Sequence, residues 1–197
     1  MMELLIATNN KGKVKEIKEI LKGLDMEVFS LADKGIDIDV EEDGKTFEEN
    51  SMKKATEIFK IANCITVADD SGLEVDALGG APGVYSARYA GEGASDEEKY
   101  TKLLNELKDV PDDKRTARFV SVVAVILPDG TRTTLRGECE GVITREPCGD
   151  GGFGYDPVFF VPQLNKTFSE VTLEEKNQIS HRGKAFRMLR EYLEKQI

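Results

Sequence analysis

Short apolar runs alternate along this chain with apolar positions spaced three or four residues apart, a pattern that predicts strands alternating with amphipathic helices. Residues 3–7 predict a first strand, and a helix follows that ends near residue 24. Residues 28–42 are predicted to be extended, and acidic side chains become more frequent toward their end. The next helix has its apolar face within residues 52–62, and it precedes a strand that ends at Asp69.

Helix starts are marked by capping boxes, in which a Ser or Thr side chain and a Glu three residues later cap the first turn. The spacing occurs at Thr46 and Glu49, at Ser95 and Glu98, and at Thr172 and Glu175. A last helix is predicted near the C-terminus, because apolar residues recur there at helical spacing from residue 185 to residue 193.

The second half of the chain contains the clearest strand signals. Residues 119–127 are rich in β-branched side chains, residues 128–130 predict a Pro-Asp-Gly turn, and residues 131–135 pair back as a hairpin. Residues 138–144 predict a further strand. This mixture of strands and helices predicts an α/β protein with a mixed sheet.

Composition narrows the classes of protein to which the chain can belong. A length of 197 residues allows one substantial core or at most two small ones, and no apolar stretch approaches the roughly 18 residues of a membrane helix. With no basic leader either, we expect a cytosolic protein. The three cysteines lack metal-site spacing and are expected to be reduced thiols. The net charge of -10 argues against nucleic-acid binding, but it permits a small phosphate ligand beside a local lysine cluster.

Two adjacent carboxylates, Asp69 and Asp70, end an apolar run and are followed by Ser71 and Gly72. Neighbouring carboxylates repel each other, and a bound cation is the usual offset. The glycine would let the backbone turn tightly or approach a ligand closely. The same four residues are also typical of an ordinary turn, so both interpretations stay open at this point.

Residues 8–13 (T-N-N-K-G-K) lie where the first strand gives way to a helix. A helix start presents unpaired backbone N–H groups and the positive end of the helix dipole, so together with Lys11 and Lys13 it could cradle a phosphate. The spacing is not that of a Walker A loop. An ordinary helix cap with surface lysines is the alternative.

An acidic segment, residues 41–44 (E-E-D-G), supplies further oxygen ligands. Mg²⁺ binds few carboxylates together with phosphate oxygens and water, so one Glu from this segment and one Asp from the adjacent pair would suffice. A solvated acidic loop is the alternative. Lys53 on the following helix could reach a phosphate, or it could pair with Glu49 four residues earlier.

A glycine-rich segment, residues 149–157, surrounds Phe153 and Tyr155 with four glycines and places Asp156 beside them. Such a loop can bring backbone N–H groups and an aromatic face close to a planar base, and a carboxylate can accept hydrogen bonds from ring N–H groups. The alternative is a glycine-rich turn whose aromatic side chains anchor the core.

His181 and Arg182 place two hydrogen-bond donors side by side, which could recognise a carbonyl group on a base. Lys176 nearby could bind a phosphate or a keto oxygen. The alternative is another helix start, with Ser180 as its N-cap. Taken together, a phosphate cradle, acidic metal ligands and a base-binding segment indicate nucleotide phosphate chemistry.

Five ordered segments resemble the inosine/xanthosine triphosphate pyrophosphatase family, the Ham1/RdgB-like house-cleaning enzymes, over nearly the whole chain. They read A-T-N-N-K-G-K at 7–13, E-E-D-G-K-T-F-E-E-N at 41–50, A-D-D-S-G-L-E-V-D-A-L-G-G-A-P-G-V-Y-S-A-R-Y-A-G at 68–91, G-F-G-Y-D-P at 152–157 and S-H-R-G at 180–183. The resemblance implies one domain over residues 1–197, with a mixed, twisted α/β sheet flanked by helices and two lobes around a central substrate cleft. It also implies a homodimer, which we expect to be cytoplasmic for the reason given above.

The resemblance further implies a hydrolase that converts the non-canonical purine nucleotides ITP, dITP and XTP to the monophosphate and pyrophosphate with Mg²⁺, which removes deaminated purines from the nucleotide pool. Glu41 and Asp70 would hold the metal, and Asp70 would act as general base toward water. The choice of Glu41 over Glu42 rests on counting back from Gly44. The residues expected to bind the substrate are Thr8, Asn9, Asn10, Lys11, Gly12, Lys13, Lys53, Ser71, Phe153, Gly154, Tyr155, Asp156, Lys176, His181 and Arg182.

Other functions are compatible with the same residues. A triphosphatase for other modified or pyrimidine nucleotides would use the same groups, and rates on a nucleotide panel would separate it. A nucleotide-binding sensor would bind without turnover, but it has no need of a water-activating carboxylate. A nucleic-acid-binding module is the weakest alternative because of the net charge, and we expect neither nucleic acid nor a membrane as a partner.

Overall fold

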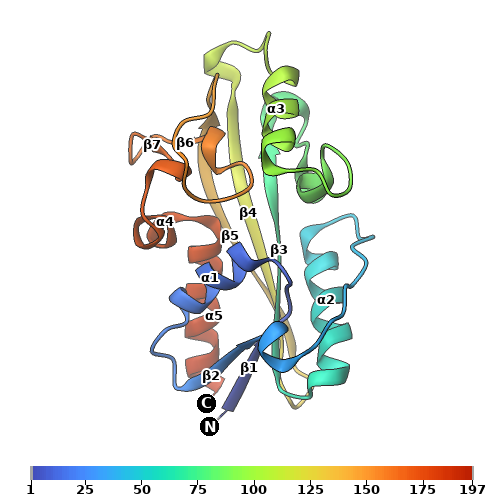
Figure 1. Ribbon diagram of the computed structural model, residues 1–197. Coiled ribbons are helices and arrows are strands. Elements are labelled where there is room, and N and C mark those ends of the chain that lie inside the picture. Colours follow the sequence, from blue (N-terminus) through green and yellow to red (C-terminus); the bar gives the residue numbers. More distant parts are fainter. Residues whose placement is uncertain (1, 197) are drawn as a thin grey trace. The chain divides into compact units, whose positions relative to one another are not determined.

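The computed structural model describes residues 2–196, which form two compact units (Figure 1). The first unit comprises the described residues of Met1–Asp70, Ser121–Gly137 and His181–Ile197. The second unit comprises Ser71–Val120 and Glu138–Ser180. The chain therefore leaves the first unit between Asp70 and Ser71, in the middle of the acidic motif.

Within residues 2–196 the strands form one seven-stranded sheet in the order β2-β1-β3-β4-β5-β6-β7. The strands are β1 (Met2–Ile6), β2 (Met26–Ser30), β3 (Ile65–Val75), β4 (Thr116–Ile126), β5 (Arg132–Ile143), β6 (Phe159–Val161) and β7 (Lys166–Thr167). Strand β1 pairs in parallel with β2 and β3, whereas β6 pairs in antiparallel fashion with β5 and β7. The sheet is therefore mixed, as predicted, and β3, β4 and β5 each continue from one unit into the other.

The helices begin where their capping residues predict. They are α1 (Lys11–Ile20), α2 (Phe47–Ala62), α3 (Asp96–Glu106), α4 (Leu173–Ile179) and α5 (His181–Gln196). Complete capping boxes open α3 and α4, which confirms both predicted starts. At α2 the Thr46 hydroxyl caps the helix, but the Glu49 carboxylate accepts from the Lys45 N–H instead of closing the box. Helix α1 ends at Ile20, earlier than predicted.

Several strand predictions were wrong. Strand β3 does not end at Asp69 but continues through the two aspartates to Val75, and β5 is one strand where two were predicted. The range 28–42 holds the end of β2 and a short 3₁₀ helix (Ala32–Lys34), and β6 and β7 were not predicted at all. The sheet order places β3 between β1 and β4, so pairing with its neighbours overrides the local turn tendency of Asp, Ser and Gly.

The core of the first unit lies on both faces of its part of the sheet (Figure 1). Along β1 the side chains alternate, so that Leu4 and Ile6 join a cluster with α1 and α5, while Leu5 joins a separate cluster with α2. Phe186 of α5 and Ile58 of α2 are both almost completely buried. The sheet is thus covered on both faces in this unit, by α1 and α5 on one and by α2 on the other.

The second unit has its own aromatic core. The rings of Phe119 and Phe159 lie 4.5 Å apart, and those of Phe159 and Phe168 lie 5.2 Å apart. Leu73 from the second half of β3 and Leu103 from α3 belong to the same cluster. None of the helices in residues 2–196 has the length and apolar character that a membrane crossing requires. The three cysteines carry no disulfide within the same residues.

Candidate active site

Asp69 and Asp70 follow each other in β3, so their side chains leave opposite faces of the sheet. Asp69 shares the face of Ile65 and Val67, which pack with α1 and α5. Asp70 shares the face of Ala68, which packs with α2. The strand itself therefore separates the two adjacent carboxylates, and their oxygens have different closest partners.

Asp69 is completely buried and is held by cations from two helices. Its Oδ2 lies 2.8 Å from Lys13 Nζ and 3.4 Å from Arg182 Nη2, and its Oδ1 accepts a hydrogen bond from the Ser121 hydroxyl. Burial alone would raise the pKa of the Asp69 carboxyl, but the charges of Lys13 and Arg182 hold it far below its usual range. Asp69 is thus a permanently charged group that ties α1 and α5 to the strand.

Arg182 lies in the first turn of α5 and is buried between two carboxylates. Its guanidinium donates to Glu16 of α1 and to Asp69. Burial would lower the pKa of Arg182, but the two carboxylates raise it above its usual range. The start of α5 is packed closely on β5, because a Cβ at Gly137 would lie 2.6 Å from the backbone nitrogen of Ala185. The sequence predicted Arg182 as a base ligand and gave no sign of its pairing with Glu16.

Asp70 is 4% exposed, and its carboxylate is less well satisfied than that of Asp69. Its Oδ1 lies 3.5 Å from Lys54 Nζ, whereas Oδ2 has no hydrogen-bond partner within the described residues. Burial raises the pKa of the Asp70 carboxyl, and Lys54 and Lys13 counteract this only in part. A buried oxygen without a partner is costly, so this oxygen is suited to accept a proton, a water or a cation.

The lysine of α2 that reaches the two aspartates is Lys54, the neighbour of the predicted phosphate ligand Lys53. Lys54 Nζ lies 2.6 Å from Glu42 Oε1, 2.8 Å from the backbone oxygen of Asp69 and 3.5 Å from Asp70 Oδ1. Lys53 points to the surface, where its ammonium pairs with Asp43 at 2.6 Å rather than with Glu49. The sequence did carry a signal for Lys54, because it lies four residues before the buried Ile58 and so on the buried face of α2.

The acidic segment 41–44 is fastened to the first turns of α2. The N–H of Gly44 donates to Asn50 Oδ1 at 2.8 Å, and a Cβ at Gly44 would lie 2.6 Å from that oxygen. Glu42 is half-buried and pairs with Lys54, whereas the side chain of Glu41 is exposed. Of the two glutamates that sequence could not separate, Glu42 is therefore the one that shares a cation with Asp70.

The turn at residues 8–13 opens α1 in the way the sequence predicts. Asn10 is the N-cap, and its side chain accepts from the Lys13 N–H at 3.0 Å. The Thr8 hydroxyl accepts from the Asn10 N–H, and the Asn9 amide donates to the backbone of Ile38. Lys13 turns toward Asp69, while Asn9, Asn10 and Lys11 remain exposed. The exposed N-terminal end of α1 is thus adjacent to the charged network around Asp69.

The donors around Asp70 suit a divalent metal ion that takes only one or two ligands from the protein. Within residues 2–196 no three His, Cys, Asp or Glu side chains gather into a complete metal site. Asp70 instead offers one unpartnered oxygen, and Glu42 lies across Lys54 from it. This donor set suits an ion such as Mg²⁺, which takes one or two carboxylates and completes its shell with phosphate oxygens and water.

The predicted base-binding residues of the second unit form a separate group. Lys176 Nζ lies 2.6 Å from Asp156 Oδ2 and 4.7 Å from the centre of the Phe153 ring, and both charged side chains are almost fully buried. Asp156 also accepts from the N–H of Phe153, and the N–H of Gly154 donates to Asp96. The segment therefore folds back on a buried ion pair with an aromatic ring above the ammonium.

Tyr155 and Ser71 have other surroundings. The Tyr155 hydroxyl donates to the backbone oxygen of Ser86, and burial raises the pKa of this buried phenol. Its ring belongs to the aromatic core, which corresponds to the anchoring alternative. Ser71 lies half-buried in β3 at the start of the second unit, whereas His181 and Arg182 belong to the first.

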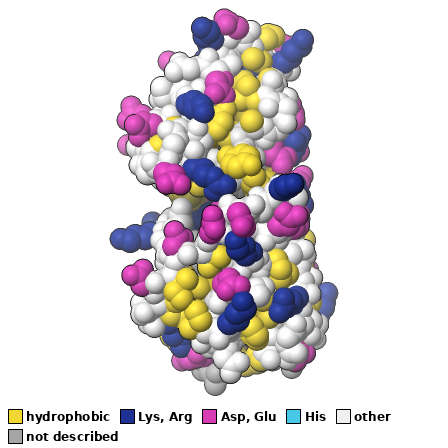
Figure 2. Space-filling model, turned by 90° about the vertical axis from the view of Figure 1, so that its right-hand side faces the viewer, with side chains coloured by type: hydrophobic (Ala, Val, Ile, Leu, Met, Phe, Trp, Pro, Cys, Tyr) yellow, Lys and Arg dark blue, Asp and Glu magenta, His cyan; other side chains and the backbone are white. Residues whose placement is uncertain are grey.

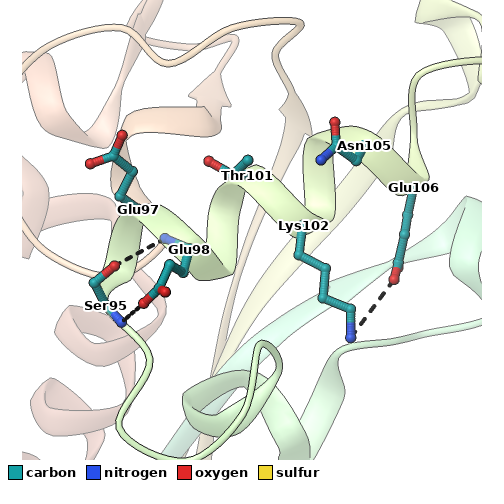
Figure 3. A pocket seen from close by; sticks show the side chains of 7 residues that line it. All are labelled: Ser95, Glu97, Glu98, Thr101, Lys102, Asn105 and Glu106. Atoms are coloured by element: carbon teal, nitrogen blue, oxygen red, sulfur yellow. Dashed lines mark hydrogen bonds and ion pairs between the residues drawn. The ribbon is translucent and has the colours of Figure 1, made fainter.

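A concavity runs along α3 and contains none of the predicted site residues (Figure 3). The residues that line it are Ser95, Glu97, Glu98, Thr101, Lys102, Asn105 and Glu106. Its polar groups already have structural partners: Ser95 and Glu98 form the capping box of α3, and Lys102 and Glu106 both hydrogen-bond to Tyr89. Figure 2 shows acidic and basic side chains interspersed on the viewed face.

Comparisons with known proteins show the family and the fold of the chain. The sequence profile of the Ham1 family matches residues 4–192. The dITP/XTP pyrophosphatase of Clostridium perfringens is 54% identical, and that of Bacillus subtilis is 50% identical; each alignment covers 98% of both chains. The solved Ham1 protein of Staphylococcus aureus has a TM-score of 0.88 at 45% identity, and that of Coxiella burnetii 0.89 at 40% identity; both matches cover 99% of this chain and 100% of the other.

Proposed function

This chain belongs to the Ham1 family, and we propose that it hydrolyses ITP, dITP and XTP to the nucleoside monophosphate and pyrophosphate in the presence of Mg²⁺. The relatives named above as dITP/XTP pyrophosphatases support this, since they match it over nearly their full length. The observation that carries the proposal is Asp70, a buried carboxylate with an unpartnered oxygen beside a buried lysine. A protein that only binds nucleotides has no need of such a group.

In the proposed reaction, water attacks the α-phosphorus, the bond from that phosphorus to the oxygen bridging it to the β-phosphorus breaks, and pyrophosphate leaves. Asp70 takes a proton from the water, since its carboxylate keeps an oxygen that no other group of the described residues occupies. When bound, Mg²⁺ supplies positive charge to the phosphate oxygens. Asp70 and one glutamate of the 41–44 segment would hold it.

The different surroundings of Glu41 and Glu42 support a choice of the glutamate that assists Asp70. Glu41 was the choice from the resemblance, and its side chain is exposed. Glu42 supports a different choice, because Lys54 bridges it to Asp70. We therefore propose Glu42 as the second metal ligand, and a comparison of the two glutamine variants decides between them.

The triphosphate would bind at the start of α1, where the predicted cradle of residues 8–13 lies. The N-terminal end of a helix attracts phosphate through its free N–H groups and its dipole. Lys13 adds a cation there, and we propose that Lys54 takes the part in phosphate binding that sequence had suggested for Lys53. Positive charge around the leaving pyrophosphate lowers the barrier by stabilising the charge that develops on it.

We propose that the group around Phe153 and Lys176 selects the base. The ring can stack on a purine, the Lys176 ammonium can donate to a 6-keto oxygen, and the Asp156 carboxylate can accept from a ring N–H. Adenine presents an amino donor where these substrates present the keto group, so it would face a second donor. His181 and Arg182 remain predicted base ligands. Lys176 carries the proposal, because Arg182 already donates to Glu16 and Asp69.

Analysis of the products tests the proposed function directly. Purified protein with dITP and Mg²⁺ should release one pyrophosphate for each dIMP, as followed by phosphorus NMR. Stepwise release of single phosphates, with dIDP as an intermediate, would contradict it. A panel with ITP, XTP, ATP and dUTP then separates a purine-selective enzyme from a general triphosphatase. The cytoplasmic location and the homodimer remain predictions, and light scattering on the purified protein tests the second.

A further inference from the structure

We propose that Lys54 is a built-in substitute for the metal ion, holding Glu42 and Asp70 together until a divalent cation replaces it there. The inference rests on the proposed function only in taking a divalent cation as the ligand of these two carboxylates. It concerns the protein without nucleotide, and it assigns Lys54 a role that opposes metal binding.

The surroundings of the Lys54 ammonium resemble those of a bound cation. Its nitrogen is approached by three oxygens from three different residues, namely a carboxylate oxygen of Glu42, the backbone oxygen of Asp69 and a carboxylate oxygen of Asp70. Carboxylate and carbonyl oxygens are the ligands that hard divalent cations take in proteins. The lysine therefore occupies the place between the two carboxylates that a metal would need.

Lys54 replaces a divalent metal ion only in part. Lys54 is 8% exposed and brings one positive charge to two carboxylates. Oδ2 of Asp70 is left without a partner within the described residues, although Asp70 is 4% exposed. A divalent cation would bring a second positive charge and could use this oxygen. The site is thus assembled in advance and remains short of positive charge.

A metal ion and the ammonium cannot both stay, because two cations within a few ångströms of each other repel strongly in a buried site. Lysine can withdraw, since its charge sits at the end of a flexible four-carbon stem. Once displaced, the Lys54 ammonium can pair with the negatively charged oxygens of a triphosphate. Metal binding and nucleotide binding are therefore coupled, because the nucleotide provides the partner that Lys54 loses to the metal.

Metal binding without any nucleotide tests this. Lys54→Met removes the competing charge and keeps the apolar stem, and Mn²⁺ is the probe, followed by electron paramagnetic resonance and calorimetry. We expect Lys54→Met to bind Mn²⁺ at least about tenfold more tightly than the natural protein, because a nearby like charge is removed. Lys53→Met is the matched control, since the neighbouring lysine pairs with Asp43 at the surface, and it should bind as the natural protein does.

Any result without a gain overturns the proposal, whether Lys54→Met binds Mn²⁺ equally well, more weakly or, like the natural protein, not at all. A gain that persists in Lys54→Met with Asp70→Asn also overturns it, because the extra ion would then lie elsewhere. If Lys54→Met is poorly folded by circular dichroism, Lys54→Gln takes its place. For either variant, Mn²⁺ should raise the melting temperature more than it does for the natural protein.

The outcome of these measurements is independent of the test of the proposed function. The Mn²⁺ titration contains no nucleotide, so it can succeed even if dITP is not the substrate. Pyrophosphate release by the natural protein can likewise be observed even if Lys54 does not compete with the metal.

Discussion

Lys13 Nζ lies 2.8 Å from Asp69 Oδ2, which joins the first turn of α1 to the middle of β3. The carboxylate of Asp69 is completely buried, and Arg182 approaches the same oxygen from α5. Asp69 therefore positions two basic residues that belong to different helices. Its neighbour Asp70 has an unpartnered oxygen instead. Replacement by Asn should therefore mainly lower stability at Asp69 and mainly lower turnover at Asp70.

Replacing Asp69 should mainly destabilise the protein. Asp69→Asn leaves Lys13 and Arg182 with less compensating charge in a buried place, and breaking one side of such a network costs roughly 3–5 kcal/mol. Urea unfolding at neutral pH measures this cost. Asp43→Asn breaks the surface pair with Lys53 and should leave the free energy of unfolding unchanged within error. Equal, small effects of both substitutions would contradict the role of Asp69.

Replacing Asp70 should mainly abolish turnover. Asp70→Asn keeps the size of the side chain but cannot take a proton, so we expect turnover of dITP to fall at least about 100-fold. Pyrophosphate release at saturating Mg²⁺ measures it, and circular dichroism confirms the fold. Turnover close to that of the natural protein would remove Asp70 from the chemistry.

The same variant should change how stability depends on pH. The folded-state pKa of Asp70 is raised above its ordinary value of 3.8, so its charge destabilises the folded protein as the pH rises from that value through the raised pKa. Asp70→Asn removes this pH-dependent loss of stability, because asparagine does not ionise. Its free energy of unfolding relative to the natural protein should therefore increase between pH 3.5 and neutral pH, as measured by urea unfolding. A difference that is constant over this range would argue against the raised pKa.

Glu41 and Glu42 should differ in their effect on Mg²⁺. Glu42→Gln removes the carboxylate that shares Lys54 with Asp70, and we expect the Mg²⁺ concentration for half-maximal turnover to rise at least about tenfold. Glu41→Gln is the matched control one position earlier and should stay close to the natural protein. The opposite ranking, measured by titrating Mg²⁺ at fixed dITP, would restore Glu41 as the ligand.

Lys176 should control the choice of base. Lys176→Met removes the donor proposed for the 6-keto oxygen, so the ratio of kcat/KM for dITP to that for dATP should fall at least about tenfold. Lys166→Met, at an exposed position on β7, is the control and should keep the ratio. A parallel fall of both rates with the ratio unchanged would indicate that the pair with Asp156 has only a structural role.

Much of the local structure could be read from the sequence. The helix starts at Ser95 and Thr172 were predicted from their spacing to Glu98 and Glu175, because a capping box satisfies its hydrogen bonds within a few residues. The apolar run of β1 and the turn at residues 8–13 are local features of the same kind. The motifs also sufficed to recognise the family, since their residues and their order along the chain are properties of the sequence alone.

Only the tertiary structure distinguished the roles of residues that are adjacent in sequence. Lys53 and Lys54 are the same residue type one position apart, and only the packing of α2 against the sheet turned Lys54 inward. Asp69 and Asp70 were separated because β3 continues between its neighbours and sends adjacent side chains to opposite faces. Lys13 and Arg182 neutralise the buried Asp69 in that strand, and both are distant from it in sequence. A carboxylate's role depends on which charges surround it, and those charges come together only when the chain folds.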